Sequence, residues 1–229
     1  MLESLGYFVR THITGRVRLR PYPARVEDVA PPIQTEPFYS LVLEACLSRD
    51  QREKIQTTWD IGCATWTYLN AVTNAFPNSI LFTGVEIDPG RRLTHLYTRG
   101  DVATAYALRS NQRGRPTRLL FQDFLEIPMV PQFHAAFCFF FPFVSPNPAR
   151  AWGLPPRFAN FPDLLAQAKR GLGKDCVILS CHQGEWERDL ALVAYQKNNL
   201  SVQTIAISAK TVQAWWPSPH GTFVCVSRG

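Results

Sequence analysis

Hydrophobic positions recur along the chain with two different periods, and segments of the two kinds follow one another. Short apolar runs rich in β-branched and aromatic residues predict strands, and apolar residues at every third or fourth position predict helices. Strands are expected at residues 55–61, 79–87, 117–122, 133–140, 176–181, 201–208 and 222–227. Helices are expected at residues 38–47, 65–75, 91–110, 161–172 and 185–198. The chain therefore alternates between strand and helix over most of its length.

This alternation predicts a parallel sheet that is covered by helices on both faces. The connection between residues 201–208 and 222–227 contains Trp215, Trp216 and Pro217 and has no room for a crossover helix. These two strands are therefore expected to pair antiparallel at one edge. The predicted fold class is α/β: a doubly wound, mostly parallel seven-stranded sheet with an antiparallel last strand. Such sheets bind ligands at the carboxyl ends of the strands, near the point where the winding reverses.

The length and the distribution of prolines predict how the chain is organised. A chain of 229 residues suits one domain with additions. Residues 1–54 contain a proline-spaced segment and only one expected helix, so we expect them to form an N-terminal extension that caps the ligand site. Residues 55–229 are expected to form the ligand-binding domain.

Composition excludes several classes of protein. Hydrophobic residues make up 46% of the chain and charged residues 18%, which excludes a disordered chain. No apolar run reaches the length of a membrane-spanning helix, and the first residues lack the pattern of a secretory signal. The six cysteines form no CxxC pair and no convincing metal-ligand spacing, so we expect reduced thiols and no metal site. A cytoplasmic protein is the expected result.

The net charge of +6 is unevenly distributed. Residues 1–25 carry five arginines against Glu3, and residues 91–118 carry seven against Asp101. Two interpretations follow: a basic surface that binds RNA, or ordinary solvated faces.

The clearest chemical pattern begins at the end of the first expected strand. Asp60 ends this strand and is followed by Gly62, Cys63 and Ala64, small residues that lead into a helix. A tight turn of small residues lets a ligand approach the backbone, and the start of the helix offers unpaired N–H groups.

Two more acidic residues follow the next strands. Glu86 ends the second strand, 24 positions after Gly62, where a carboxylate can accept hydrogen bonds from ribose hydroxyls. Asp123 follows the third strand and can accept a hydrogen bond from an exocyclic amine such as that of adenine. The pattern therefore predicts a nucleoside-binding site.

This series of motifs resembles the class I S-adenosylmethionine-dependent methyltransferases, which have an acid-x-Gly-x-Gly-x-Gly motif and a sheet that ends in an antiparallel strand. The resemblance covers about residues 55–229 and implies S-adenosylmethionine as the cofactor. It implies that Asp60 and Gly62 hold the amino-acid end of the cofactor, that Glu86 holds the ribose, and that Asp123 holds the adenine amine. It also places four further residues at the cofactor: Cys63, Ala64, Ile87 and Phe124.

The chain departs from the family motif at two glycine positions. Ala64 stands in place of the second glycine and Trp66 in place of the third. The indole would either stack on the amino-acid part of the cofactor or close that part of the site. A nicotinamide dehydrogenase is a weaker alternative, because its G-x-G-x-x-G motif would need glycines at Ala64 and Thr67.

The acceptor side of the expected site is aromatic. Phe141 and Phe143 follow the fourth strand, and Trp152 lies in a proline-rich segment after them. This region lacks the Asn/Asp-Pro-Pro-aromatic motif, which argues against methylation of an amino group on DNA or protein. We expect these three residues to line a pocket for a small-molecule acceptor. RNA is the alternative acceptor.

His182 is the expected general base, because it follows the fifth strand and an unperturbed imidazole titrates near neutral pH. The competing interpretation is that His182 only caps the next helix. A protein with this fold that has lost catalysis is a further alternative, which Trp66 and the missing acceptor motif favour.

Overall fold

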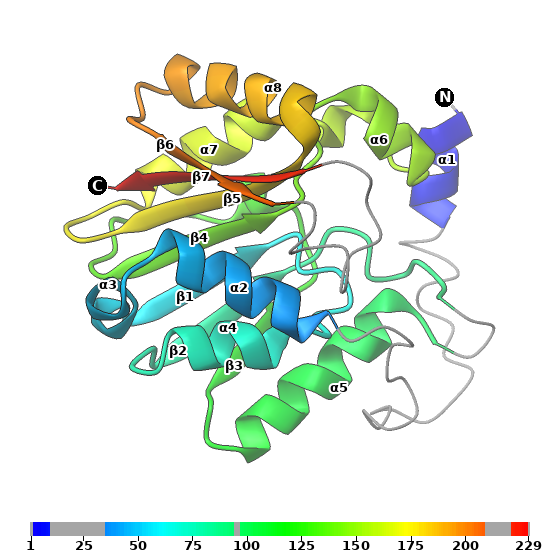
Figure 1. Cartoon of the computed structure of the whole chain (residues 1–229). Coiled ribbons are helices and arrows are strands. Elements are labelled where there is room, and N and C mark those ends of the chain that lie inside the picture. Colours follow the sequence, from blue (N-terminus) through cyan, green and yellow to red (C-terminus); the bar gives the residue numbers. More distant parts are fainter. Residues whose placement is uncertain (1, 10–34, 94–96, 209–220, 229) are drawn as a thin grey trace.

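A seven-stranded sheet forms the centre of the protein (Figure 1). The structure is a computed structural model that describes residues 2–9, 35–93, 97–208 and 221–228. The strands lie in the order β3-β2-β1-β4-β5-β7-β6. Their bounds are β1 Thr57–Ile61, β2 Leu81–Val85, β3 Thr117–Leu120, β4 Ala135–Phe140, β5 Val177–Gln183, β6 Gln203–Ile207 and β7 Thr222–Arg228.

The sheet has the predicted topology. Strand β1 pairs in parallel with both β2 and β4, so the winding reverses at β1 and β4. Strand β7 runs antiparallel to β5 and to β6, and β6 forms the edge. The predicted doubly wound, mostly parallel α/β sheet with an antiparallel last strand is confirmed.

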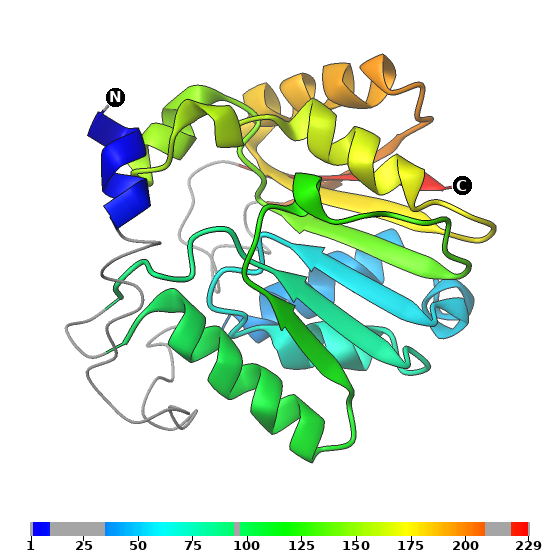
Figure 2. The same ribbon diagram turned by 180° about the vertical axis from the view of Figure 1, so that it is seen from behind.

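Helices cover both faces of the sheet, as Figures 1 and 2 show from opposite sides. One hydrophobic core joins α2, α4 and α5 to the sheet, and the other joins α7 and α8 to its opposite face. The α-helices are α1 Leu2–Phe8, α2 Glu36–Cys46, α3 Arg49–Lys54, α4 Leu69–Ala75, α5 Arg99–Gln112, α6 Pro146–Ala151, α7 Phe161–Arg170 and α8 Gly184–Lys197. Two short 3-10 helices are η4 Phe124–Glu126 and η5 Pro156–Phe158.

Two helices begin later than the periodicity predicts. Helix α4 begins at Leu69 because the preceding loop contains Ala64 and Trp66 at positive φ, which no α-helix allows. Helix α5 begins at Arg99 because Thr98 and Asp101 form a capping box, in which each side chain bonds the backbone N–H of the other residue. These local contacts fix where the helices start.

The N-terminal residues that the structure describes contribute to both the core and the rim of the site. Helix α2 is buried through Phe38, Val42 and Leu43 and belongs to the first core. The division of the chain at residue 54 stays a prediction. The arginines of the basic segment 10–25 and the Trp215–Trp216 turn lie outside the described residues.

In the part of the chain that the structure describes, none of the helices is long and apolar enough to cross a membrane.

Candidate active site

A cavity of about 430 Å³ opens at the carboxyl ends of β1, β2 and β4. This is the place where the winding of the sheet reverses, and ligands of doubly wound sheets bind there. The cavity brings together most of the residues expected at the site. The lining includes Gly62, Ala64, Glu86, Ile87, Asp123, Phe124, Phe141, Phe143 and Trp152.

The loop after β1 presents its backbone to the cavity. Gly62 has a φ of +78°, and a Cβ at this position would meet no atom within 4 Å, so the backbone is open to a ligand. The amide of Gly62 donates to the carbonyl of Val85, 2.8 Å away, which holds the turn against β2. The residue expected to bind the amino-acid end therefore lies at an accessible turn.

Among the described residues, Glu86 accepts hydrogen bonds from three groups. Its Oε2 accepts from the amide of Ala64 at 2.9 Å, and its Oε1 accepts from the amide of Asp88 at 2.8 Å. The guanidinium of Arg99 also donates to Oε1 at 3.0 Å, and both side chains of this ion pair are buried. A carboxylate has about four acceptor positions, so the donors from the described part of the chain leave room on the Oε2 atom for one more.

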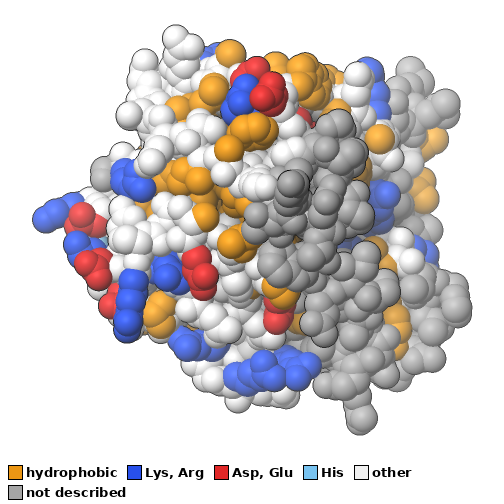
Figure 3. Space-filling model, in the orientation of Figure 1, with side chains coloured by type: hydrophobic (Ala, Val, Ile, Leu, Met, Phe, Trp, Pro, Cys, Tyr) orange, Lys and Arg blue, Asp and Glu red, His pale blue; other side chains and the backbone are white. Residues whose placement is uncertain are grey.

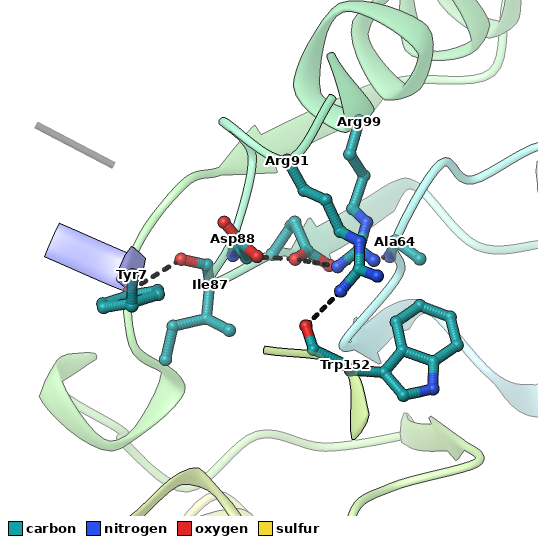
Figure 4. Close-up of polar contacts among 8 residues, drawn as sticks. Tyr7, Ala64, Ile87, Asp88, Arg91, Arg99 and Trp152 are labelled. Atoms are coloured by element: carbon teal, nitrogen blue, oxygen red, sulfur yellow. Dashed lines mark hydrogen bonds and ion pairs between the residues drawn. The ribbon is translucent and has the colours of Figure 1, made fainter. Parts of the chain in front are cut away.

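Trp152 lies beside this ion pair in the lining of the cavity. The guanidinium carbons of Arg91 and Arg99 lie 4.8 Å and 5.3 Å from the centre of the Trp152 ring (Figure 4). Arg91 also donates a hydrogen bond to the carbonyl of Trp152. Near them the Tyr7 hydroxyl donates to the carbonyl of Ile87 at 2.9 Å. These contacts connect α1, the loop after β2 and the end of α6 at one rim of the cavity.

Asp60 is placed differently from the expectation. It is 1% exposed and does not line the cavity. Its Oδ2 accepts from the indole N–H of Trp66 at 2.8 Å, and its Oδ1 accepts from the Tyr68 hydroxyl at 3.2 Å. Burial, and to a smaller degree the negative charge of Glu86, raise the pKa of Asp60 to about 7, against the lowering effect of the two hydrogen bonds.

Trp66 and Cys63 point into the core beneath the loop. Both side chains are fully buried and neither lines the cavity. The Trp66 ring lies on Gly84, where an added Cβ would come within 2.8 Å of the indole and 3.0 Å of the Cys63 sulfur. The indole therefore neither closes the cavity nor stacks on a ligand in it. The sulfur of Cys63, a residue expected at the cofactor, packs against Gly84 of β2, so its side chain does not line the cavity.

The adenine end of the expected site follows β3. The Oδ1 atom of Asp123 accepts from the amide of Leu125 at 3.0 Å and so caps η4. The ring of Phe124 packs edge-on against Phe139 with the ring centres 6.2 Å apart. Asp123 is thus held at the rim of the cavity, with Phe124 and Ile87 as apolar neighbours in the lining.

Two tyrosines that the sequence did not single out also line the cavity. Tyr39 of α2 stacks on Tyr68 with ring centres 3.7 Å apart and planes inclined by 9°, and both line the cavity. Phe141, at a φ of +58°, stacks on Phe38 at 5.8 Å. Helical spacing places Tyr39 in the helix at 38–47, but only the packing of α2 on α4 brings it to the cavity.

Comparisons with known proteins agree on the fold. No protein-family model matches the chain, and no curated protein matches it. Among solved structures, a geranyl diphosphate C-methyltransferase of Streptomyces coelicolor has a TM-score of 0.57 and 11% identity, over 99% of this chain and 97% of the other. A precorrin-6y C5,15-methyltransferase of Geobacter metallireducens has a TM-score of 0.53 and 13% identity, over 86% and 91%. The chain has the class I methyltransferase fold.

Within this methyltransferase fold, His182 lies away from the cavity. No histidine is found among the described residues of its lining. His182 is 0% exposed, its Nε2 lies 2.7 Å from the Ser180 hydroxyl, and its ring packs on Phe161 of α7. Burial lowers the pKa of His182 to about 3. The expectation of a general base is corrected: strand β5 extends to Gln183, so His182 alternates into the core under α7 and α8.

The arginines of residues 91–118 are engaged in contacts within the methyltransferase fold. Arg113 donates to the side chain of Asn70, Arg115 to the carbonyl of Pro77 and Arg118 to the Thr83 hydroxyl. Arg91 and Arg99 contact Trp152. Figure 3 shows basic side chains interspersed with acidic ones on the described part of one face.

No group of three or more histidine, cysteine, aspartate or glutamate side chains in the described residues could hold a metal ion.

Proposed function

We propose that the protein is an S-adenosylmethionine-dependent methyltransferase that acts on a small-molecule acceptor. The observation that carries this proposal is the convergence of Gly62, Glu86 and Asp123 on one cavity in a chain with the methyltransferase fold. Each of these residues follows a different strand, so the sheet itself sets their arrangement.

The residues present fit the cofactor. The remaining acceptor position on Oε2 of Glu86 suits a ribose hydroxyl, and Asp123 suits the exocyclic amine of adenine. Ile87 and Phe124 supply apolar surface for the ring, and the open backbone at Gly62 lets the amino-acid end approach. When bound, the cofactor supplies an electrophilic methyl group on a sulfonium.

The rest of the cavity suits a small, flat or apolar acceptor. Its walls on this side are Tyr39, Tyr68, Phe140, Phe141 and Phe143. Aromatic walls exclude water and orient a bound ring, and methyl transfer depends mainly on proximity and alignment. Precorrin-6y and geranyl diphosphate, named for two of the structural neighbours, are also small molecules.

Binding of S-adenosylhomocysteine tests this proposal. We expect micromolar affinity in calorimetry of the full chain, and a loss of about tenfold or more in Glu86→Gln and in Asp123→Asn, because each variant weakens a hydrogen bond to a charged acceptor. The matched control is Glu126→Gln, in the 3-10 helix that Asp123 caps but exposed and outside the lining. It should bind as the wild type does.

Two outcomes would contradict the proposal. A folded wild-type protein that binds neither S-adenosylmethionine nor S-adenosylhomocysteine would favour a protein without catalysis. Binding of NADH alone would favour a nicotinamide-dependent site instead.

A further inference from the structure

Most acidic side chains of the cavity are already engaged in contacts that fix the fold. Glu86 bonds Arg99 and two backbone amides, and Asp123 caps η4. Glu187 accepts from the amide of Gln183 at 2.8 Å, at the start of α8. Removal of a proton from an acceptor needs a group that can hold it, and His182 lies outside the cavity.

Tyr68 connects the cavity with a buried carboxylate. It lines the cavity, and its hydroxyl donates to Oδ1 of Asp60 at 3.2 Å. The stack with Tyr39 holds its ring, and Phe140 packs edge-on with ring centres 5.4 Å from Tyr68. A phenol that donates to a carboxylate keeps its own lone pairs for another donor. Tyr68 is therefore placed to accept a hydrogen bond from a molecule in the cavity.

The surroundings of Asp60 suit a group that takes up and releases a proton near neutral pH. The Trp66 indole holds Oδ2, so the carboxylate has one fixed orientation. The ionisable groups of the described residues that interact with it are Tyr39 of α2, Cys63 and Tyr68 of the loop before α4, Glu86 after β2 and Cys138 of β4. No cation neutralises Asp60 among these groups, and its pKa is raised to about 7. A base with a pKa near the working pH is the most effective kind.

We propose that Tyr68 and Asp60 together form the general base of the methyl transfer, and that the acceptor is an aromatic hydroxyl. This rests on the proposed function. A hydroxyl must lose its proton to become a strong nucleophile, and the stacked aromatic walls fit the ring that carries it.

The proposed step moves one proton from the acceptor through Tyr68 to Asp60. The acceptor O–H gives its proton to the phenolic oxygen of Tyr68, while the proton of Tyr68 passes to Oδ1 of Asp60. The O–H bond of the acceptor would break as its oxygen bonds the methyl carbon, and the bond from that carbon to the sulfonium sulfur would break with its electron pair left on the sulfur, giving S-adenosylhomocysteine. Asp60 would change from carboxylate to carboxylic acid. After product release Asp60 returns the proton through Tyr68 to water.

The test compares variants of the full chain with tritium-labelled S-adenosylmethionine and two probe acceptors, catechol and naphthol. The wild-type rate should rise with pH to a plateau, with a midpoint near the pKa of Asp60, about 7. Tyr68→Phe and Asp60→Asn should reduce the rate about 100-fold or more. The remaining rate of these variants should rise with pH as the phenol of the acceptor ionises in solution, and should show no plateau with a midpoint near pH 7. The matched control, Tyr106→Phe, removes a hydroxyl in the core of α5, outside the cavity lining, and should keep the midpoint.

A second measurement follows Asp60 without any turnover. The indole N–H resonance of Trp66, assigned with Trp66→Phe, should shift with a midpoint near pH 7 in the complex with S-adenosylhomocysteine. The proposal is overturned if this resonance does not titrate between about pH 5 and pH 9. Transfer to neither probe, or an unchanged pH profile in Tyr68→Phe, would also overturn it. Failure of S-adenosylhomocysteine to bind would instead contradict the proposed function itself.

Discussion

Replacing Trp66 by glycine is expected to lower the free energy of unfolding by about 4 kcal/mol and to leave the affinity for S-adenosylhomocysteine no higher than in the wild type. The indole is fully buried, contacts Gly84 and donates to Asp60. Its loss creates a cavity in the core and removes a donor from a buried carboxylate. Glycine recovers only about 1 kcal/mol at the positive φ of this position.

Urea unfolding and calorimetry on the same samples check this prediction. Trp66→Phe is the matched variant, since it keeps an aromatic ring and removes the N–H that bonds Asp60. It should lose about 1–3 kcal/mol, the cost of an unsatisfied buried acceptor. A glycine variant that keeps its stability and binds the ligand tenfold more tightly would show that the indole obstructs the site.

The architecture could be predicted because its signals are local and repeated. Apolar runs and their spacing predict the strands, and the alternation of strands with helices gives the parallel sheet. The expected ligand residues follow strand ends directly, so parallel strands carry Gly62, Glu86 and Asp123 to the same edge. The position of such residues can be predicted without knowing how the side chains pack.

The orientation of a single side chain depends on contacts that periodicity does not contain. Asp60 lies near the end of β1 as expected, but its carboxylate turns to Trp66 and Tyr68 instead of the cavity. Trp66 can be buried there only because Gly84 on the next strand leaves room for the ring. The spacing of apolar residues within one segment does not show that a ring from that segment fits against a glycine of another.

Some missed features did have a local signal. The T-x-x-D pattern of Thr98 and Asp101 is a capping box and marks the start of α5 more sharply than the apolar spacing before it. For His182, the decisive fact is the length of β5. The strand pairs with β7 as far as Gln183, so alternation along it sends His182 into the core.

The stability of the protein is expected to respond to pH through two buried groups that act in opposite directions. The pKa of Asp60 is raised from 3.8 to about 7, so between these values the folded protein holds a proton that the unfolded chain has released. Stability from this group therefore falls as pH rises from about 4 to about 7. The pKa of His182 is lowered from 6.5 to about 3, so its contribution rises with pH between about 3 and 6.5.

Each group changes the free energy of unfolding by on the order of 4 kcal/mol across its full range, because one pKa unit corresponds to about 1.4 kcal/mol. Between about pH 4 and pH 6.5 the two slopes offset each other. The stability of the wild-type protein should therefore change little with pH in this range, although each group alone has a large effect.

Single substitutions should make the pH dependence of stability that each group contributes measurable. Relative to the wild type, the stability of Asp60→Asn should gain about 1.4 kcal/mol per pH unit between about pH 4.5 and pH 6. His182→Gln, which keeps a polar partner for Ser180, should lose a similar amount per pH unit over the same range. Urea unfolding at four pH values measures both slopes, and the double variant should return to the wild-type slope. An Asp60→Asn slope equal to that of the wild type would show that Asp60 does not titrate near neutral pH, and would also remove the support it gives to the proton path through Tyr68.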